Sequence, residues 1–94
     1  MNQNDIETII LGRLYDSYFR DSSAVNLHTI CDEFGVDKTV FWKAIDYMTH
    51  QGLIEAYAMG GNYIIHSIGI LRAEAEDIVT ENLKIENQHI RTMR

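Results

Sequence analysis

The chain has no proline and a single cysteine among its 94 residues. One cysteine, Cys31, excludes an intrachain disulfide and any zinc site built from several cysteines. No apolar run approaches the ~20 residues that a helix needs to cross a bilayer, so we expect no membrane contact. No basic segment followed by a long apolar stretch opens the sequence, so we predict no signal peptide and a cytoplasmic location.

Motifs of enzymes and of cofactor sites are also lacking. The four histidines are scattered, and no pair has the spacing of a metal-binding HExxH helix. The glycine pair in "MGGN" (59–62) does not belong to a phosphate-binding pattern such as GxGxxG or GxxxxGK. The sequence therefore predicts a protein that is not an enzyme, with no cofactor and no metal.

Positive charge is scarce. The net charge is −6 and the isoelectric point is about 5.0, which disfavours strong non-specific binding to nucleic acid. Hydrophobic residues make up 46% of the chain and charged residues 23%, as in an ordinary globular protein. The length suits one compact domain. A local basic patch remains compatible with the acidic total.

Three segments place apolar residues at the spacing of an amphipathic helix. Their expected ranges are 5–20, 27–34 and 38–51. The predicted N-caps are Asn4, Asn26 and Asp37. Gly35 is suited to the left-handed end of the second helix, and Gly52 ends the third. The short polar segment between the second and third helices predicts that they are joined by a tight turn.

Two β-prone runs, 53–58 and 63–67, flank the pair Gly60-Gly61, which is typical of a two-residue hairpin turn. A two-residue turn places Ala58 opposite Tyr63 and Tyr57 opposite Ile64. Val25 has room for only a very short strand. We therefore expect a hairpin after the third helix.

From about Ile68 the pattern is helical to near the end of the chain, ~36 Å at 1.5 Å per residue. A heptad seam runs along this expected helix. It consists of Leu71, Ala75, Ile78, Asn82, Ile85 and His89. Its far half has no evident cover within the chain, so we predict a homodimer through this seam. Docking of the helix on another protein is the alternative.

The stretch "LHTICDEFGVDKTVFWKAIDYMTHQGLI" (27–54) resembles the bacterial and archaeal winged helix-turn-helix regulators. The family pattern has a small residue four before the turn glycine, here Cys31, and a cap two after it, here Asp37. An apolar residue follows six after that glycine, here Phe41, and the third helix ends before "GLI". The resemblance implies an α+β, mainly α, winged helix. It has a three-helix core and two-stranded wing (1–67) and a long C-terminal helix (68–94).

By the same resemblance, Lys38, Thr39, Trp42 and Lys43 would face double-stranded DNA. The favoured function is thus a DNA-binding protein of transcription-regulator type that acts as a homodimer. Charge argues the other way, because the formal charge of 37–51 is zero and the wing tip has no Lys or Arg. A winged-helix module that binds another protein, without DNA, is therefore the alternative.

Overall fold

The computed structural model describes the backbone of residues 1–92 and, apart from residues 79–80 and 89–92, their side chains. Its elements are α1 (Gln3–Arg20), β1 (Val25–Asn26), α2 (Leu27–Phe34), α3 (Lys38–His50), β2 (Ile54–Ala58), β3 (Asn62–Ile65), α4 (Ser67–Ala75) and α5 (Ile78–Thr92). This described part combines five helices with a three-stranded antiparallel sheet. The α+β, mainly α class predicted from the sequence is thus confirmed.

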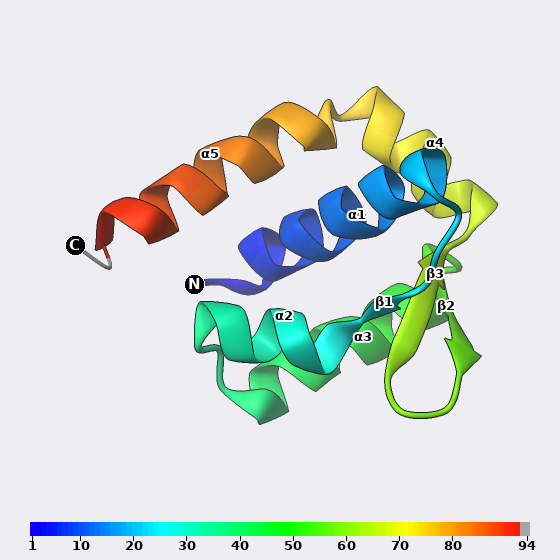
Figure 1. The fold of residues 1–94 in the computed structure, drawn as a ribbon, viewed down its shortest axis with the longest axis horizontal. Coiled ribbons are helices and arrows are strands. Elements are labelled where there is room, and N and C mark those ends of the chain that lie inside the picture. The colour runs from blue at the N-terminus through cyan, green and yellow to red at the C-terminus, as the bar shows by residue number, and fades with distance from the viewer. Residues whose placement is uncertain (93–94) are drawn as a thin grey trace.

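Helix α1 is the centre of the molecule. It lies between α5 on one side and the layer of α2 and α3 on the other (Figure 1). Eight of its residues are buried, and they point in all directions around the helix. They are Ile6, Glu7, Thr8, Ile9, Ile10, Leu11, Gly12 and Leu14. The predicted cap at Asn4 is wrong, since α1 begins earlier and Asn2 accepts a hydrogen bond from the Asp5 amide at 2.8 Å.

The two helices α2 and α3 follow the sequence prediction closely. Asn26 caps α2 by accepting from the backbone N–H groups of His28 and Thr29, and Asp37 caps α3 at Val40. Gly35 ends α2 with φ 62°, a left-handed conformation that glycine adopts without steric cost. The core face of α3 consists of Phe41, Ala44, Ile45 and Met48, all buried. Burial of each larger side chain contributes roughly 1.5–3 kcal/mol, which holds α3 against the core.

The strand order is β1-β3-β2, so the short segment at Val25 adds a third strand to the hairpin. The predicted register is wrong. Ala58 pairs with Asn62, Ala56 with Tyr63, and the chain is irregular between them at residue 57. The side-chain amide of Asn62 donates to the Met59 carbonyl at 3.0 Å. That bond closes a loop that includes Met59. The observed pairing departs from the predicted one by one residue at Asn62 and by two residues at Tyr63.

The expected single C-terminal helix is also wrong, because the chain breaks between α4 and α5. Asp77 has φ 49°, in the left-handed region that Asp tolerates better than most residues. The Glu76 amide donates to the Arg72 carbonyl and closes the end of α4. The chain bends at this point, and α5 runs back along α1 (Figure 1).

Helix α5 is therefore covered by its own chain, contrary to the sequence prediction. Ile78 and Asn82 are buried, and Ile85 is half-buried against the core. Asn82 packs on Gly12 so closely that a Cβ at position 12 would lie 2.8 Å from its Cβ. Leu71 and Ala75, on α4, are exposed. The side chain of His89, the last residue of the predicted seam, lies outside the described part.

Candidate nucleic-acid interface

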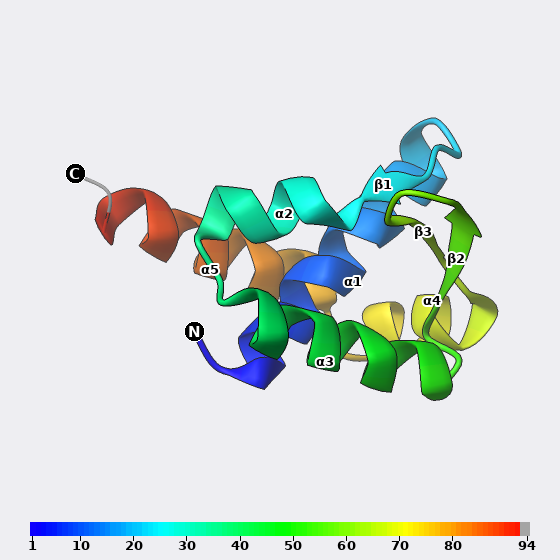
Figure 2. The same ribbon diagram turned by 90° about the horizontal axis from the view of Figure 1, so that it is seen from below.

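Helix α3 presents the residues predicted to contact DNA. It lies beside α2 in the layer that these two helices form, and the β2–β3 hairpin follows its C-terminal end (Figure 2). Lys38, Thr39 and Lys43 are all exposed, the last two on the side of α3 away from its buried residues. A spacing of four residues places Thr39 and Lys43 on one strip of the helix surface, whereas Lys38 lies about 140° from Lys43 around the helix. The structure therefore places two of the four predicted residues side by side and leaves Lys38 exposed at the start of the same helix.

Trp42, the fourth, is half-buried and packs within the molecule. Its ring centroid lies 4.7 Å from that of His28 on α2 and 6.3 Å from that of Tyr63 on β3. Ring centroids at 4.5–7 Å are in the range of favourable aromatic packing. Trp42 thus connects α3 with α2 and with the hairpin, and it positions the surface that the two lysines share.

The tip of the hairpin is held against the start of α2. The Leu27 amide donates to the Gly61 carbonyl at 2.9 Å, and the Asn26 side chain donates to the Gly60 carbonyl at 3.1 Å. The ring of His28 lies over Gly61, where a Cβ would come within 2.6 Å of its Cδ2. These contacts join residues more than 30 positions apart, so no local pattern in the sequence indicated them. They fix the position of the hairpin relative to α3.

The charge on this surface is mixed. Asp37 accepts the Val40 amide as the cap of α3, and Asp46 is exposed one turn beyond Trp42. On the hairpin side, His66 Nε2 lies 3.6 Å from the Glu55 carboxylate. No Lys or Arg occurs between positions 54 and 65. Positive charge is therefore confined to the two lysines of α3.

Apolar side chains are exposed beside this strip. Tyr57 is 69% exposed and Met59 is 94% exposed, both on the hairpin. Val40 and Tyr47 are exposed on α3. Single exposed apolar residues are ordinary on a protein surface, whereas several on neighbouring elements are typical of interaction sites. The surface thus combines a small basic strip with an apolar hairpin tip.

The single thiol of the chain lies in the core and not at this surface. Cys31 is buried, and burial is the main cause that raises the pKa of its thiol above the usual value. The thiol donates a hydrogen bond to the Val36 carbonyl at 3.3 Å. Among the side chains that the structure describes, no three His, Cys, Asp or Glu are grouped so that they could hold a metal ion. Within the same part of the chain, no helix has the length and apolar character required to cross a membrane.

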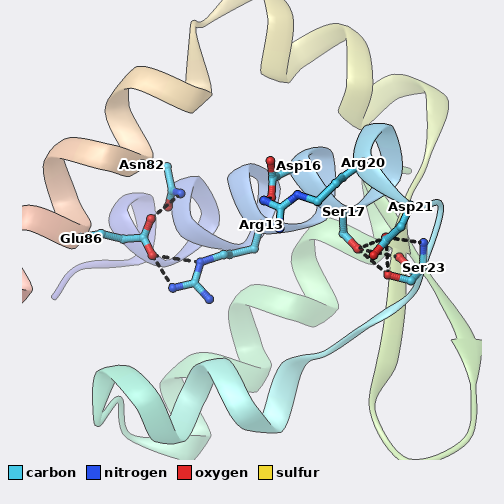
Figure 3. Close-up of polar contacts among 8 residues, drawn as sticks. All are labelled: Arg13, Asp16, Ser17, Arg20, Asp21, Ser23, Asn82 and Glu86. Carbon is cyan, nitrogen blue, oxygen red and sulfur yellow. Dashed lines mark hydrogen bonds and ion pairs between the residues drawn. The ribbon is translucent and has the colours of Figure 1, made fainter.

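A second feature, a cleft of about 400 Å³, lies between α1 and α5. Arg13 lines it and is bonded to Glu86 through two nitrogens, one of them Nε at 3.0 Å (Figure 3). The Nη2 of Arg13, one of these two nitrogens, also lies 2.9 Å from the carboxylate of Glu33 on α2. Burial lowers the pKa of Arg13, but the hydrogen bonds and charges of the two glutamates outweigh it and raise the pKa overall. The sequence analysis missed this network, because its partners lie on three separate helices.

Comparison with known proteins identified no relative: no protein-family model, no curated protein and no solved structure matched the chain.

Proposed function

We propose that this chain is a winged helix-turn-helix protein that binds double-stranded DNA through α3, as a homodimeric regulator of transcription in the cytoplasm. The element order supports the fold, since α2, a tight turn at Gly35 and α3 precede the β2–β3 hairpin. The short β1 pairs with β3, so that the hairpin extends from the three-helix core as a wing. The resemblance of residues 27–54 to the family agrees with that order.

The observation that carries the proposal is the arrangement of α3. Four buried residues fix one face of this helix to the core, Thr39 and Lys43 lie exposed on the opposite face, and Lys38 is exposed at the start of the helix. Its 13 residues span about 20 Å, and an α-helix of this kind fits the major groove of B-DNA. Lysine and threonine at such positions contact phosphates or base edges. Trp42 positions the helix and is not itself a reader of bases.

The small number of lysines on α3 limits the affinity for DNA. Each phosphate contact contributes roughly 0.9 to the slope of log affinity against log salt concentration, and one chain offers two lysines on α3. A dimer offers four, which gives a slope of roughly −3 to −4. The net charge of −6 opposes binding further. We therefore expect weak binding of mixed-sequence DNA that is detectable only at low salt.

The test is fluorescence anisotropy of a labelled duplex at several salt concentrations, with Lys43→Glu as the variant. We expect Lys43→Glu to weaken binding tenfold or more and to make the salt slope less steep. Lys84→Glu is the matched control, since Lys84 is exposed on α5, where its ammonium lies 3.3 Å from Glu81. Equal loss in both variants, or no binding by the wild type at low salt, would overturn the proposal.

A protein-interaction module is the second candidate, and the exposure of Tyr57 and Met59 on the hairpin favours it. The variant Met59→Lys separates the two functions. If the wing lies over the DNA backbone, a cation at its tip adds a phosphate contact, and duplex binding becomes tighter with a slope steeper by about one unit per chain. If the hairpin serves a protein partner, Met59→Lys leaves duplex binding unchanged.

A further inference from the structure

The connection between α4 and α5 is a hinge of two residues, Glu76 and Asp77. Asp77 holds φ 49°, a left-handed conformation that disfavours residues with a Cβ. If Asp77 becomes helical, α4 and α5 join into one helix over 67–92, about 39 Å long. A short connection with strained backbone is the kind that favours exchange of an element between two copies of a chain.

The heptad seam is continuous in sequence across this hinge, yet the hinge divides it in the folded chain. Leu71 and Ala75 precede the hinge and are exposed on α4, and Leu71 is 68% exposed. Ile78 and Asn82 follow it and are buried. A straight helix places all four on one side, because their spacings of four, three and four residues follow a heptad. The sequence is therefore compatible with two arrangements, and the observed one leaves the first half of the seam uncovered.

The contact between α5 and α1 is polar in its middle, where Asn82 packs on Gly12. The side-chain amide of Asn82 donates to Glu86 at 2.9 Å (Figure 3). Its Oδ1 is shielded from solvent and has no hydrogen-bond partner in the described part of the chain. A buried carbonyl without a partner weakens a contact. The cleft beside it also leaves part of the α1 surface unfilled. The packing of α5 on its own α1 is thus specific in shape, but it leaves a buried carbonyl oxygen of Asn82 without a hydrogen bond in the described part of the chain.

We propose that two copies of the chain exchange α5, so that each α5 packs on the α1 of the other copy. Asp77 becomes helical, and the straight helices meet near their hinges, where they cover Leu71. A second copy is the natural partner, since its α1 supplies the same notch at Gly12 and the same Arg13 for Glu86. This inference rests on the homodimer proposed above and specifies how that dimer forms.

A disulfide distinguishes exchange from every other dimer. In a Cys31→Ala background, Gly12→Cys and Asn82→Cys place two thiols side by side, where Cβ positions lie 2.8 Å apart, so that α1 and α5 need to separate by about 1 Å to reach the ~3.8 Å of a disulfide. Oxidation of the closed chain links residues 12 and 82 of one molecule. Oxidation of exchanged dimers at high protein concentration links two molecules, which migrate at twice the mass on a non-reducing gel. We expect the second product to increase with concentration.

A pair of hinge variants tests the same proposal without new cysteines. Asp77→Gly favours the closed hinge, because glycine adopts positive φ freely. Asp77→Ala favours the straight helix. We expect the dissociation constant of the dimer, measured by sedimentation, to be at least about tenfold lower for Asp77→Ala than for Asp77→Gly, since two hinges change in each dimer.

The outcomes separate this inference from the proposed function. A dimer whose disulfide is intrachain at every concentration overturns the exchange and leaves the homodimer in place. Wild type and Asp77→Ala that both stay monomeric at every concentration overturn both. If the double-cysteine variant fails to fold, equal dimer affinities of Asp77→Gly and Asp77→Ala overturn the exchange alone.

Discussion

At the tip of the hairpin, Gly61 meets two demands at once. Its φ is 83°, and the ring of His28 occupies the place where a Cβ would lie, at 2.6 Å. Gly60 has a similar φ of 86°, but the nearest atom to a Cβ there is 3.9 Å away. A side chain at Gly60 therefore introduces backbone strain alone, whereas a side chain at Gly61 introduces the same strain and a clash with His28.

We expect Gly60→Ala to lower the free energy of unfolding by about 1 kcal/mol, the cost of positive φ in a residue with a Cβ. Gly61→Ala adds the displacement of His28 and should cost about 1 kcal/mol more. Urea unfolding followed by Trp42 fluorescence measures both. Equal losses in the two variants would show that the His28 contact contributes nothing to stability.

Cys31 gives a prediction that depends on pH. Burial raises the pKa of its thiol above the ordinary value of 9.0, so the folded protein has less thiolate at any given alkaline pH than the unfolded chain. We expect slow reaction with a thiol reagent at pH 8 and a fast reaction in denaturant.

The raised pKa of Cys31 also determines how the free energy of unfolding changes with pH. Above about pH 9 the unfolded thiol ionises while the folded one stays protonated, so the free energy of unfolding falls as pH rises. Cys31→Ala should remove this part of the pH dependence. A folded-state reaction at pH 8 as fast as in denaturant would contradict the raised pKa.

At the scale of elements, Gly69 determines how α4 packs. A Cβ on this residue would lie 2.1 Å from the backbone carbonyl oxygen of Leu53, the same oxygen that accepts the His66 amide. Replacement of a helical glycine by alanine ordinarily stabilises a protein by up to about 1 kcal/mol. Here the approach of two backbone segments reverses that expectation.

We expect Gly69→Ala to lower the free energy of unfolding by about 1–3 kcal/mol, because a carbonyl cannot move aside as a side chain can. Gly12→Ala on α1 is the matched control. Its Cβ would lie 2.8 Å from the Cβ of Asn82, which only a shift of the α5 backbone can relieve, whereas a Cβ at Gly69 would lie 2.1 Å from a carbonyl oxygen. Chemical unfolding of both variants tests the order, and a stabilising Gly69→Ala would refute the close approach.

At the scale of the whole molecule, α1 contributes to every layer of the core. Glu7 on α1 is buried and pairs with Arg72 on α4 at 3.4 Å, and Arg13 joins α1 to both Glu86 and Glu33. Ile78 of α5 belongs to the same apolar cluster as the residues of α2 and α3. Residues 1–67 and 68–92 are therefore linked by one core.

We expect a single cooperative transition in which Trp42 fluorescence and helical circular dichroism change together in denaturant at low protein concentration. Trp42 reports on α3 and the hairpin, whereas the helical signal includes α4 and α5. Loss of part of the helical signal before the fluorescence changes would contradict a shared core and would indicate that α5 unfolds separately.

The local features of α2 and α3 were predicted correctly from the sequence, whereas the cap of α1 was not. The caps Asn26 and Asp37, the left-handed Gly35 and the core face of α3 all depend on residues within one or two turns of each other. The predicted hairpin register was wrong, because the two-glycine pattern did not indicate the irregularity at residue 57 or the Asn62 bond to Met59. The packing of Trp42 against His28 and Tyr63 joins three elements, and no local pattern indicated it.

What the sequence determined by itself is the order of elements as far as the hairpin, the mainly helical α+β class and the exposed positions of Lys38, Thr39 and Lys43 on α3. Periodicity and capping are sufficient for these, because each is satisfied within its own segment. Only the tertiary structure decided the course of the chain after Ala75. The heptad pattern shows that the seam packs on an apolar surface, but it does not specify on which surface. The turn at Asp77 directs α5 onto α1 of the same chain, where Gly12 leaves room for Asn82.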